Sequence, residues 1–223
     1  MKTIETTAPP GTLNQNEILR MIYERRAVRK YKDLAVDRKD IEAIVDAGRM
    51  APSAINRQPW RFYVVDKKED IAGLEKEVLK SAAKGILKSG FKTIIKSATR
   101  SLHLAHGIDF LKNKNPIFHG APVVVFLTAP EDNEWACLDL GMCAQNMMLA
   151  AKSMGLDSCP IGLGKYVQGT KGYAKLKIPE KEKVMLALIF GYGDEKPSVH
   201  DRIRTNLFYP DLDAACGDCE TAE

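Results

Sequence analysis

Two apolar segments in the middle of the chain limit the folds that it can adopt. Val123 to Thr128 is an unbroken run rich in β-branched residues, which predicts a central strand buried on both faces. The pattern from Trp135 to Met154 predicts a helix with apolar residues on nearly every side, and such a helix is buried all round. In a chain of 223 residues, one way to reach this burial is to pack one side of the helix on the sheet and another against a second subunit.

Basic residues gather at the end of the first predicted helix, where four cations lie within the six residues from Arg25 to Lys30. We expect this helix to begin at Asn14, with Glu17 reaching back to the cap. Cations at the last turn complement the carbonyl end of a helix, which accounts for one or two of the four. Guanidinium groups also bind phosphate or a planar heteroatom edge better than lysine does. An anion site and a solvated basic end are both consistent with this stretch.

The overall composition argues against several classes of protein. With 33 basic and 29 acidic residues, the net charge of +4 does not indicate a nucleic-acid-binding protein. The first eleven residues are typical of a flexible leader and not of a secretory signal, and the longest apolar runs are too short to span a bilayer. We therefore expect a soluble cytoplasmic protein with no membrane partner. We then expect reduced cysteines. The C-x-x-C of Cys216 and Cys219 lacks the second ligand pair of a zinc site, so a mobile tail that can oxidise is favoured over the alternative of a redox or metal-binding motif.

A short polar loop follows the second predicted helix. Asp37 is expected to cap that helix, which ends before a proline. The prolines that bracket the stretch from Pro52 to Pro59 predict a rigid loop. Its Ser53 and Asn56 are either ordinary turn formers or a fixed array of hydrogen-bonding groups for a polar heterocycle or a sugar chain. The alternating residues from Trp60 to Asp66 predict a strand.

The segment from Lys67 to Asn115 is expected to form two or three helices with sparse apolar positions. We interpret them as helices lying over the surface, as a lid or as an arm on a partner subunit. His103 and His106 are three residues apart in this segment, but no further ligands accompany them, so we expect surface or pocket histidines and no metal site.

The last third of the chain carries a glycine-containing stretch and a second basic pair. Gly155 is expected to end the long helix in a left-handed conformation, and Asp157 to Gly164 to form a loop that a flat ligand can approach closely. No dinucleotide or phosphate-loop fingerprint is present, so a nucleotide-like cofactor would bind without a Rossmann fold. Beyond a last strand at Val184 to Phe190, Arg202 and Arg204 project to the same face of an extended segment. One shared phosphate-bearing ligand explains why two arginine clusters flank these loops.

Taken in chain order, these stretches resemble the FMN-dependent nitroreductase family. The matching pieces are Arg25-Arg26-x-x-Arg29, Pro52-Ser53-x-x-Asn56-x-Gln58-Pro59-Trp60, Gln145-Asn146, Gly155-Leu156-x-Ser158-Cys159-Pro160-Ile161-Gly162 and Arg202-x-Arg204. Each piece alone is weak, whereas five in the family's order are specific. The resemblance implies an α+β fold with a mixed, mainly antiparallel central sheet flanked by helices, in an interlocked homodimer with FMN at the subunit interface. It places one domain at residues 13–210, with a variable helical lid at about 67–118, a leader at 1–12 and a tail at 211–223.

The resemblance also implies the residues of the cofactor site. The phosphate and ribityl side of FMN would be held by Arg25, Arg26 and Ala27. The phosphate would also be contacted by Arg202 and Arg204. Arg29 would approach the pyrimidine edge of the flavin, and the reactive N5 edge would lie beside Pro160, Ile161 and Gly162. The partner chain would supply Ser53, Ala54 and Asn56, next to Pro52. This chain departs from the family at Ala27, where serine is frequent, and at Gly162, where several members carry glutamate.

The activity implied by the resemblance is hydride transfer from NADH or NADPH to FMN and then to a small acceptor such as a nitroaromatic or a quinone, with ping-pong kinetics. The flavin does the chemistry, so neither a catalytic side chain nor a metal is implied. A cation at Arg29 would stabilise the reduced flavin, so replacing it by alanine is expected to lower the reduction potential. Alternatives on the same scaffold are flavin fragmentation, dehalogenation of aromatic amino acids and azoline oxidation, and the alternative of another class is a non-catalytic flavin-binding protein.

Overall fold

The computed structural model describes residues 2–3, 16–88, 115–203 and 205–209. The chain divides into two units, one formed by residues 1–20 and 198–223 and the other by residues 21–197. In the first unit, β1 (Lys2–Thr3) pairs with β6 (Phe208–Tyr209) in an antiparallel ladder. Most of the predicted leader and the whole predicted tail, with Cys216 and Cys219, lie outside the described residues, and so do His103 and His106.

The unit of residues 21–197 is built on a four-stranded sheet with the order β2-β3-β5-β4. Its strands are β2 (Arg61–Val65), β3 (Val123–Pro130), β4 (Asp157–Ile161) and β5 (Glu182–Gly191). Every pair of neighbours is antiparallel, so the mainly antiparallel sheet that we expected is present. β3 is buried along all but its last residue, which confirms the prediction of a central strand.

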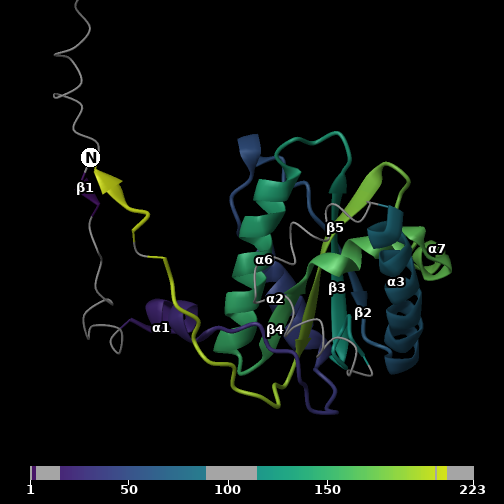
Figure 1. Ribbon diagram of the computed structural model, residues 1–223, viewed down its shortest axis with the longest axis horizontal. Coiled ribbons are helices and arrows are strands. Elements are labelled where there is room, and N and C mark those ends of the chain that lie inside the picture. Colours follow the sequence, from purple (N-terminus) through teal and green to yellow (C-terminus); the bar gives the residue numbers. More distant parts are fainter. Residues whose placement is uncertain (1, 4–15, 89–114, 204, 210–223) are drawn as a thin grey trace, which may run out of the picture. The chain divides into compact units, whose positions relative to one another are not determined.

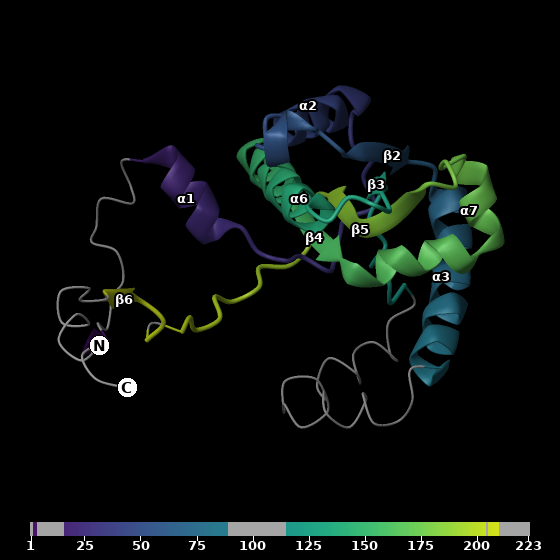
Figure 2. The same cartoon turned by 90° about the horizontal axis from the view of Figure 1, so that it is seen from above.

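Helices cover both faces of this sheet (Figures 1 and 2). α2 (Arg38–Arg49) and α6 (Ala136–Ser153) lie on one face. The other face carries α3 (Lys68–Lys88), the 3₁₀ helix η3 (Gly162–Gly169) and α7 (Lys171–Leu176). Alternate side chains of β3 therefore enter two different cores, with Val125 among those facing α2 and α6, and Phe126 among those facing α3 and η3.

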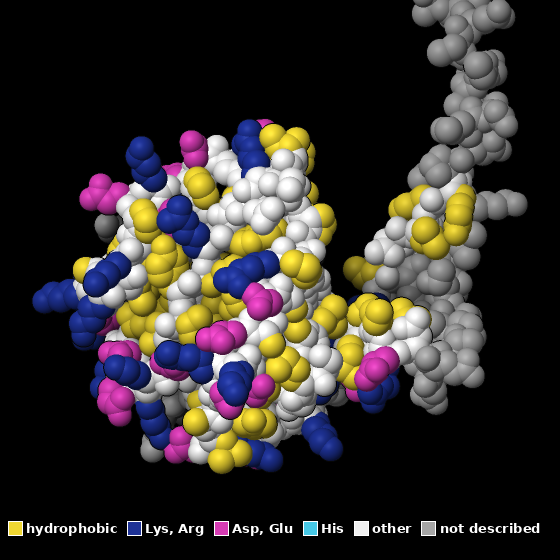
Figure 3. Space-filling model, turned by 180° about the vertical axis from the view of Figure 1, so that it is seen from behind, with side chains coloured by type: hydrophobic (Ala, Val, Ile, Leu, Met, Phe, Trp, Pro, Cys, Tyr) yellow, Lys and Arg dark blue, Asp and Glu magenta, His cyan; other side chains and the backbone are white. Residues whose placement is uncertain are grey.

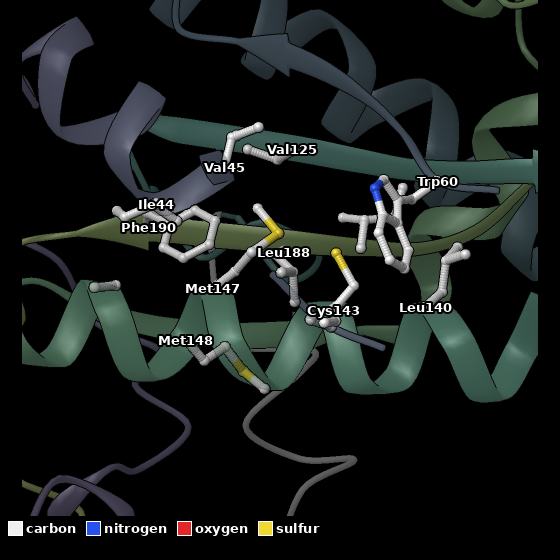
Figure 4. Packing of buried hydrophobic residues seen from close by; sticks show 14 of the residues in the cluster. Ile44, Val45, Trp60, Val125, Leu140, Cys143, Met147, Met148, Leu188 and Phe190 are labelled. Atoms are coloured by element: carbon white, nitrogen blue, oxygen red, sulfur yellow. The ribbon is translucent and has the colours of Figure 1, made fainter. Parts of the chain in front are cut away.

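The core between α2, α6 and the sheet is tightly packed (Figure 4). Trp60, Cys143 and Met147 fill it with side chains that are almost completely shielded from solvent. α2 approaches α6 closely at Gly48, where a Cβ atom would lie 2.7 Å from Cγ of Met147. The methionine side chain therefore fills space that a larger residue at position 48 would need, and it acts as core filler.

α6 is not buried all round in the described chain, which differs from the sequence prediction. Its side facing the sheet and α2 is buried, whereas Leu138 on the other side is 56% exposed. Trp135, at the start of the helix, is 49% exposed. The sheet and α2 therefore leave one apolar side of α6 exposed.

Helix caps account for where the helices begin and end. α1 (Glu17–Glu24) starts at Asn16, whose Oδ1 accepts hydrogen bonds from the N atoms of Ile18 at 3.0 Å and Leu19 at 3.2 Å. The cap is therefore the asparagine next to the helix, and not Asn14, which lies outside the described residues. The expected cap of α2 is confirmed, because Asp37 accepts from N of Lys39.

The stretch from Asp157 to Gly164 is not the loop that we expected. Its first five residues form β4, an edge strand that pairs only with β5 in the sheet. Pro160 is compatible with this position because an edge strand tolerates a residue without an N–H group. The expected left-handed conformation of Gly155 is confirmed by a φ of +78°.

The first part of the segment that follows β2 belongs to the core. Ile71, Leu74, Val78 and Ala82 of α3 are all buried, at helical spacing. The sequence interpretation of surface helices with sparse apolar positions was wrong for this part of the segment. Residues 89–114 lie outside the described part of the chain.

A buried carboxylate connects three strands of the sheet. Oε2 of Glu182 accepts a hydrogen bond from the hydroxyl of Thr128 and lies 3.5 Å from the hydroxyl of Tyr63. Oε1 of Glu182 lies 2.7 Å from Nε of Arg61. The pairing of β3 with β5 shifts register beside Thr128, so the carboxylate satisfies polar groups where the ladder is irregular.

We expect Glu182→Ala to destabilise the protein by about 1 to 3 kcal/mol, because the buried hydroxyl of Thr128 loses its acceptor. The midpoint of urea unfolding measures the change. Glu131→Ala is the matched control, since Glu131 pairs with Lys183 at an exposed site, and it should cost less than about 0.5 kcal/mol. Equal losses in the two variants would contradict a special role for the buried carboxylate.

Candidate active site

A segment of irregular backbone from Ala27 to Lys32, which we call the strap, lies against the edge of the sheet. N of Val28 donates to the carbonyl of Ser158 in β4 at 3.1 Å. At the other end, N of Lys32 donates to the carbonyl of Tyr192, just beyond β5, at 2.8 Å. The residues that follow α1 are therefore extended along the sheet, and Arg25 and Arg29 do not share a helical face.

Tyr31 fixes the strap from within the core. Its hydroxyl donates to the carbonyl of Val28 at 2.7 Å, and its ring lies against Gly191, where a Cβ atom would be 2.9 Å from the ring. Burial strongly raises the pKa of this phenol, and the charges of nearby acidic groups add to the rise. Tyr31 is therefore a permanent hydrogen-bond donor to the strap.

The strap forms part of the wall of an open cavity of about 910 Å³. This volume is in the range of cofactor and ligand sites, which is about 300 to 1,000 Å³. The remaining walls come from the end of β4, the start of η3, the turn at residues 115–120 and the residues after β5. Of the residues that sequence analysis assigned to the cofactor, the cavity brings together Ala27, Arg29, Pro160, Ile161 and Gly162.

The arginines of the basic stretch have different surroundings. Nη1 of Arg26 donates to the carbonyls of Tyr23 at 2.6 Å and Arg25 at 2.7 Å, so Arg26 caps the end of α1. Arg29 is exposed at the cavity, and none of the ion pairs among the described residues includes it. The guanidinium of Arg29 is thus available to an anionic or planar ligand.

Glu75 of α3 holds the turn that forms another part of the wall. Its two carboxylate oxygens accept hydrogen bonds from N of Ile117 at 2.6 Å and N of Phe118 at 2.7 Å. Burial raises the pKa of Glu75, and the two hydrogen bonds partly offset this rise. Sequence analysis missed this residue, although an acid next to the buried Leu74 in the apolar stripe of α3 was the signal.

His119 follows in the same turn and lines the cavity. Its backbone is left-handed, with a φ of +55°, which is uncommon for a residue with a side chain. Burial lowers the pKa of His119 to about 4, and the positive charge of Arg29 also lowers it, whereas Glu195 acts in the opposite direction. The imidazole is therefore neutral at pH 7.

The polar loop at Pro52 to Pro59 lies at a different cavity, of about 450 Å³, whose lining includes Pro52, Ser53 and Ala54. No residue lines both cavities. The loop contains the 3₁₀ helix η2 (Ala54–Asn56), and Ile55 has a φ of +46°, a strained conformation for a β-branched residue. Strain of this kind persists only where the surrounding structure enforces it, and it is frequent at functional sites.

Two side chains enforce the conformation of this loop. Oγ of Ser53 accepts from N of Gln58 at 2.9 Å, and Oδ1 of Asp139 in α6 accepts from N of Ala54 at 3.1 Å. Asp139 is almost completely buried, and its Oδ2 has no hydrogen-bond partner among the described residues. Sequence analysis missed Asp139, although a single acid inside the apolar pattern of the long helix was the signal.

Other predicted cofactor residues are not at the first cavity. Arg25 and Arg26 precede the strap without lining the cavity, and Asn56 lies exposed in the loop at the second cavity. Arg202 belongs to the unit of residues 1–20 and 198–223, where its Nη1 donates to the carbonyl of His200 at 2.7 Å. Arg204 lies outside the described residues.

The described ranges contain neither a metal-binding cluster nor a membrane-spanning helix. No three His, Cys, Asp or Glu side chains are grouped there as they would be around a metal ion. None of the helices in that part of the chain has the length and apolar character needed to cross a bilayer.

The chain belongs to the nitroreductase family, because the model of that family matches residues 22–192. The match includes the strap, the whole four-stranded sheet and the lining of the second cavity, and it ends before Asp194, Glu195 and Pro197 of the first cavity. The family resemblance drawn from the sequence motifs is therefore confirmed.

The names of individual relatives and of a solved structure agree with this family. A 4-nitrobenzoate reductase from Pseudomonas putida is 27% identical over 205 residues, which cover 81% of this chain and 87% of the relative. A protein from Methanothermobacter thermautotrophicus, provisionally named an NADH dehydrogenase/NAD(P)H nitroreductase, is 28% identical and covers 90% of this chain and 87% of its own length. The fold matches a nitroreductase with bound FMN from Desulfitobacterium hafniense, with a TM-score of 0.71, 25% identity, and coverage of 88% of this chain and 99% of that one.

The low pKa of His119 predicts a pH dependence of stability. The pKa of His119 is about 4 in the folded protein, whereas the ordinary value of 6.5 applies to the unfolded chain. Between pH 4 and pH 6.5 the unfolded chain therefore binds more protons than the folded protein does. The free energy of unfolding consequently falls as the pH drops from about 6.5 to about 4. Urea midpoints at pH 7 and pH 5 should therefore differ less in His119→Gln than in the unmodified protein. The same difference in both proteins would contradict a half-buried imidazole that is neutral in the folded state.

Proposed function

We propose that this chain is an FMN-dependent NAD(P)H oxidoreductase that reduces small acceptors such as nitroaromatics and quinones. The observation that carries the proposal is the cavity of about 910 Å³, which gathers Ala27, Arg29 and Pro160 to Gly162 from segments far apart in sequence. The FMN bound in the Desulfitobacterium hafniense structure and the name of the Pseudomonas putida relative support this cofactor and this class of acceptor.

The chemistry of the cavity fits a flavin. Pro160 and Ile161 offer an apolar surface, and a Cβ atom on Gly162 would meet nothing within 4 Å, so the edge of the cavity is open there. Arg29 brings a positive charge, and His119 a neutral imidazole. Arg25 and Arg26 would hold the phosphate outside the cavity, next to the strap that they precede, and Arg26 would use the guanidinium N–H groups that do not cap α1.

The protein's part in the reaction is orientation and charge. When bound, FMN takes a hydride from NADH or NADPH and passes it to the acceptor in turn. Arg29 would bring a positive charge to the bound flavin, which would favour the negative charge that develops on reduction. The strap and the Glu75-bound turn keep the walls rigid around the ring.

We further propose a homodimer in which the loop at Pro52 to Pro59 of one chain completes the cavity of the other. The two cavities of one chain share no lining residue, as expected if each is half of a site that two chains complete. Apolar side chains are also exposed beside the second cavity, where Ile55 is 83% and Leu138 is 56% exposed. Figure 3 shows apolar side chains gathered on one face of the unit of residues 21–197. Contiguous exposed apolar surface of this kind marks interaction sites.

An anaerobic visible spectrum of the purified protein, before and after addition of NADH or NADPH, tests the function. We expect a yellow protein that bleaches with one of the nucleotides and regains its colour with a nitroaromatic or a quinone. Colour that resists both nucleotides would contradict NAD(P)H as the electron donor and would indicate another reductant or a non-catalytic flavin-binding protein. Colourless protein that cannot be reconstituted with FMN would contradict the proposal altogether.

Leu138→Glu tests the dimer. A charge on this apolar surface is expected to weaken dimerisation roughly 100-fold, or about 2.8 kcal/mol, and to weaken FMN retention with it. Sedimentation velocity and the ratio of visible to protein absorbance measure the two effects. Leu138→Ala, at the same position without a charge, should remain dimeric. Full FMN retention by a monomeric variant would show that one chain suffices for the site.

A further inference from the structure

One acidic side chain of the cavity wall bonds to the main chain of the strap. Oε1 of Glu195 accepts a hydrogen bond from N of Arg29 at 2.5 Å, across 166 residues of sequence. Glu195 is half-buried and lines the cavity together with Arg29. The N atoms of Val28 and Lys32 bond to main-chain carbonyls, so the carboxylate supplies an acceptor to the strap between these two attachments.

The contact does not neutralise the guanidinium of Arg29. The carboxylate bonds to the main-chain N atom, and the ion pairs among the described residues include neither Arg29 nor Glu195. The cavity wall therefore contains a positive and a negative side chain that are distant in sequence and close in space, and their charges do not form an ion pair. A ligand in the cavity is exposed to the field of both.

The charge of Glu195 acts on the groups around the cavity. Burial is the largest influence on the pKa values of Tyr31, His119 and Cys159. Beyond burial, Glu195 raises all three pKa values, and Arg29 lowers all three. Both charges thus reach the cavity interior, and they act in opposite directions.

We propose that Glu195 is a positioning residue of the cofactor cavity, which fixes the main chain of Arg29 and lowers the reduction potential of the bound flavin. This inference rests on the proposed function. Reduction places negative charge on the flavin, so a nearby carboxylate disfavours the reduced state and a nearby guanidinium favours it. Glu195 and Arg29 therefore set the potential in opposite directions.

Two substitutions separate the bond from the charge. Glu195→Gln keeps an oxygen acceptor of the same reach but removes the charge, whereas Glu195→Ala removes both. In Glu195→Gln we expect the ratio of reduced to oxidised flavin at a fixed ambient potential to rise about tenfold, which is about 30 mV for a two-electron couple. A spectroelectrochemical titration measures it. Arg29→Ala should shift the potential the opposite way.

Asp194→Asn is the matched control for charge. Asp194 lines the same cavity but is exposed, and its side chain does not bond to Arg29. Because solvent screens an exposed charge, its removal should shift the potential less than Glu195→Gln does. An equal or larger shift in Asp194→Asn would overturn the role of Glu195 in setting the potential.

Hydrogen exchange at the amide of Arg29 tests the bond independently of the flavin. We expect exchange in Glu195→Ala to be about tenfold faster or more, and exchange in Glu195→Gln to stay close to that of the unmodified protein. Equal exchange in all three proteins would overturn the assignment. A protein that binds no FMN would overturn the proposed function and the effect on the potential, and the exchange rates would then still decide whether Glu195 holds Arg29.

Discussion

The cavity depends on hydrogen bonds that hold an irregular segment against the edge of a sheet. The strap has no ladder of its own, so its position is set by main-chain bonds to Ser158 and Tyr192 and by the phenol of Tyr31 beneath it. These acceptors lie on β4 and just beyond β5, which are neighbours in the sheet. The sheet in turn is fixed by the two cores that β3 divides. Arg29 is therefore placed by the packing of residues that never touch a ligand.

Two buried carboxylates play a similar part at the two cavities. Glu75 binds the N–H groups of the turn before β3, and Asp139 binds an N–H group of the loop after α2. Each lies on a helix that packs against the sheet, so each transfers the rigidity of a helix to an irregular segment. Burying a carboxylate costs free energy, and the N–H groups that it binds offset part of the cost. The turn at the first cavity and the loop at the second are thus each positioned by a buried carboxylate in otherwise apolar surroundings.

Much of this fold could be predicted from the sequence because it follows from periodic patterns. The unbroken run at Val123, the cap at Asp37 and the glycine at position 155 each determine local structure by themselves, and each prediction was confirmed. β4 was missed because its proline and the glycines beyond it have the composition of a loop, whereas tertiary pairing with β5 makes it a strand. The motif residues predicted Arg29 and Gly162 at one cavity. Glu195 could not be found, because its partner is a main-chain N–H group distant in sequence. The partners of Glu75 are also distant N–H groups, so only its place in the apolar stripe of α3 pointed to it.

The place of Glu75 on α3 has a consequence for how such chains can diverge. Glu75 lies in the first half of α3, well before the helix ends at Lys88. The turn that it holds is therefore anchored upstream of whatever follows that helix. The segment beyond Lys88 can therefore change in length or sequence without removing the two hydrogen bonds that hold the turn. The position of this wall thus depends on a single carboxylate of α3 and not on the length of chain between Lys88 and the turn.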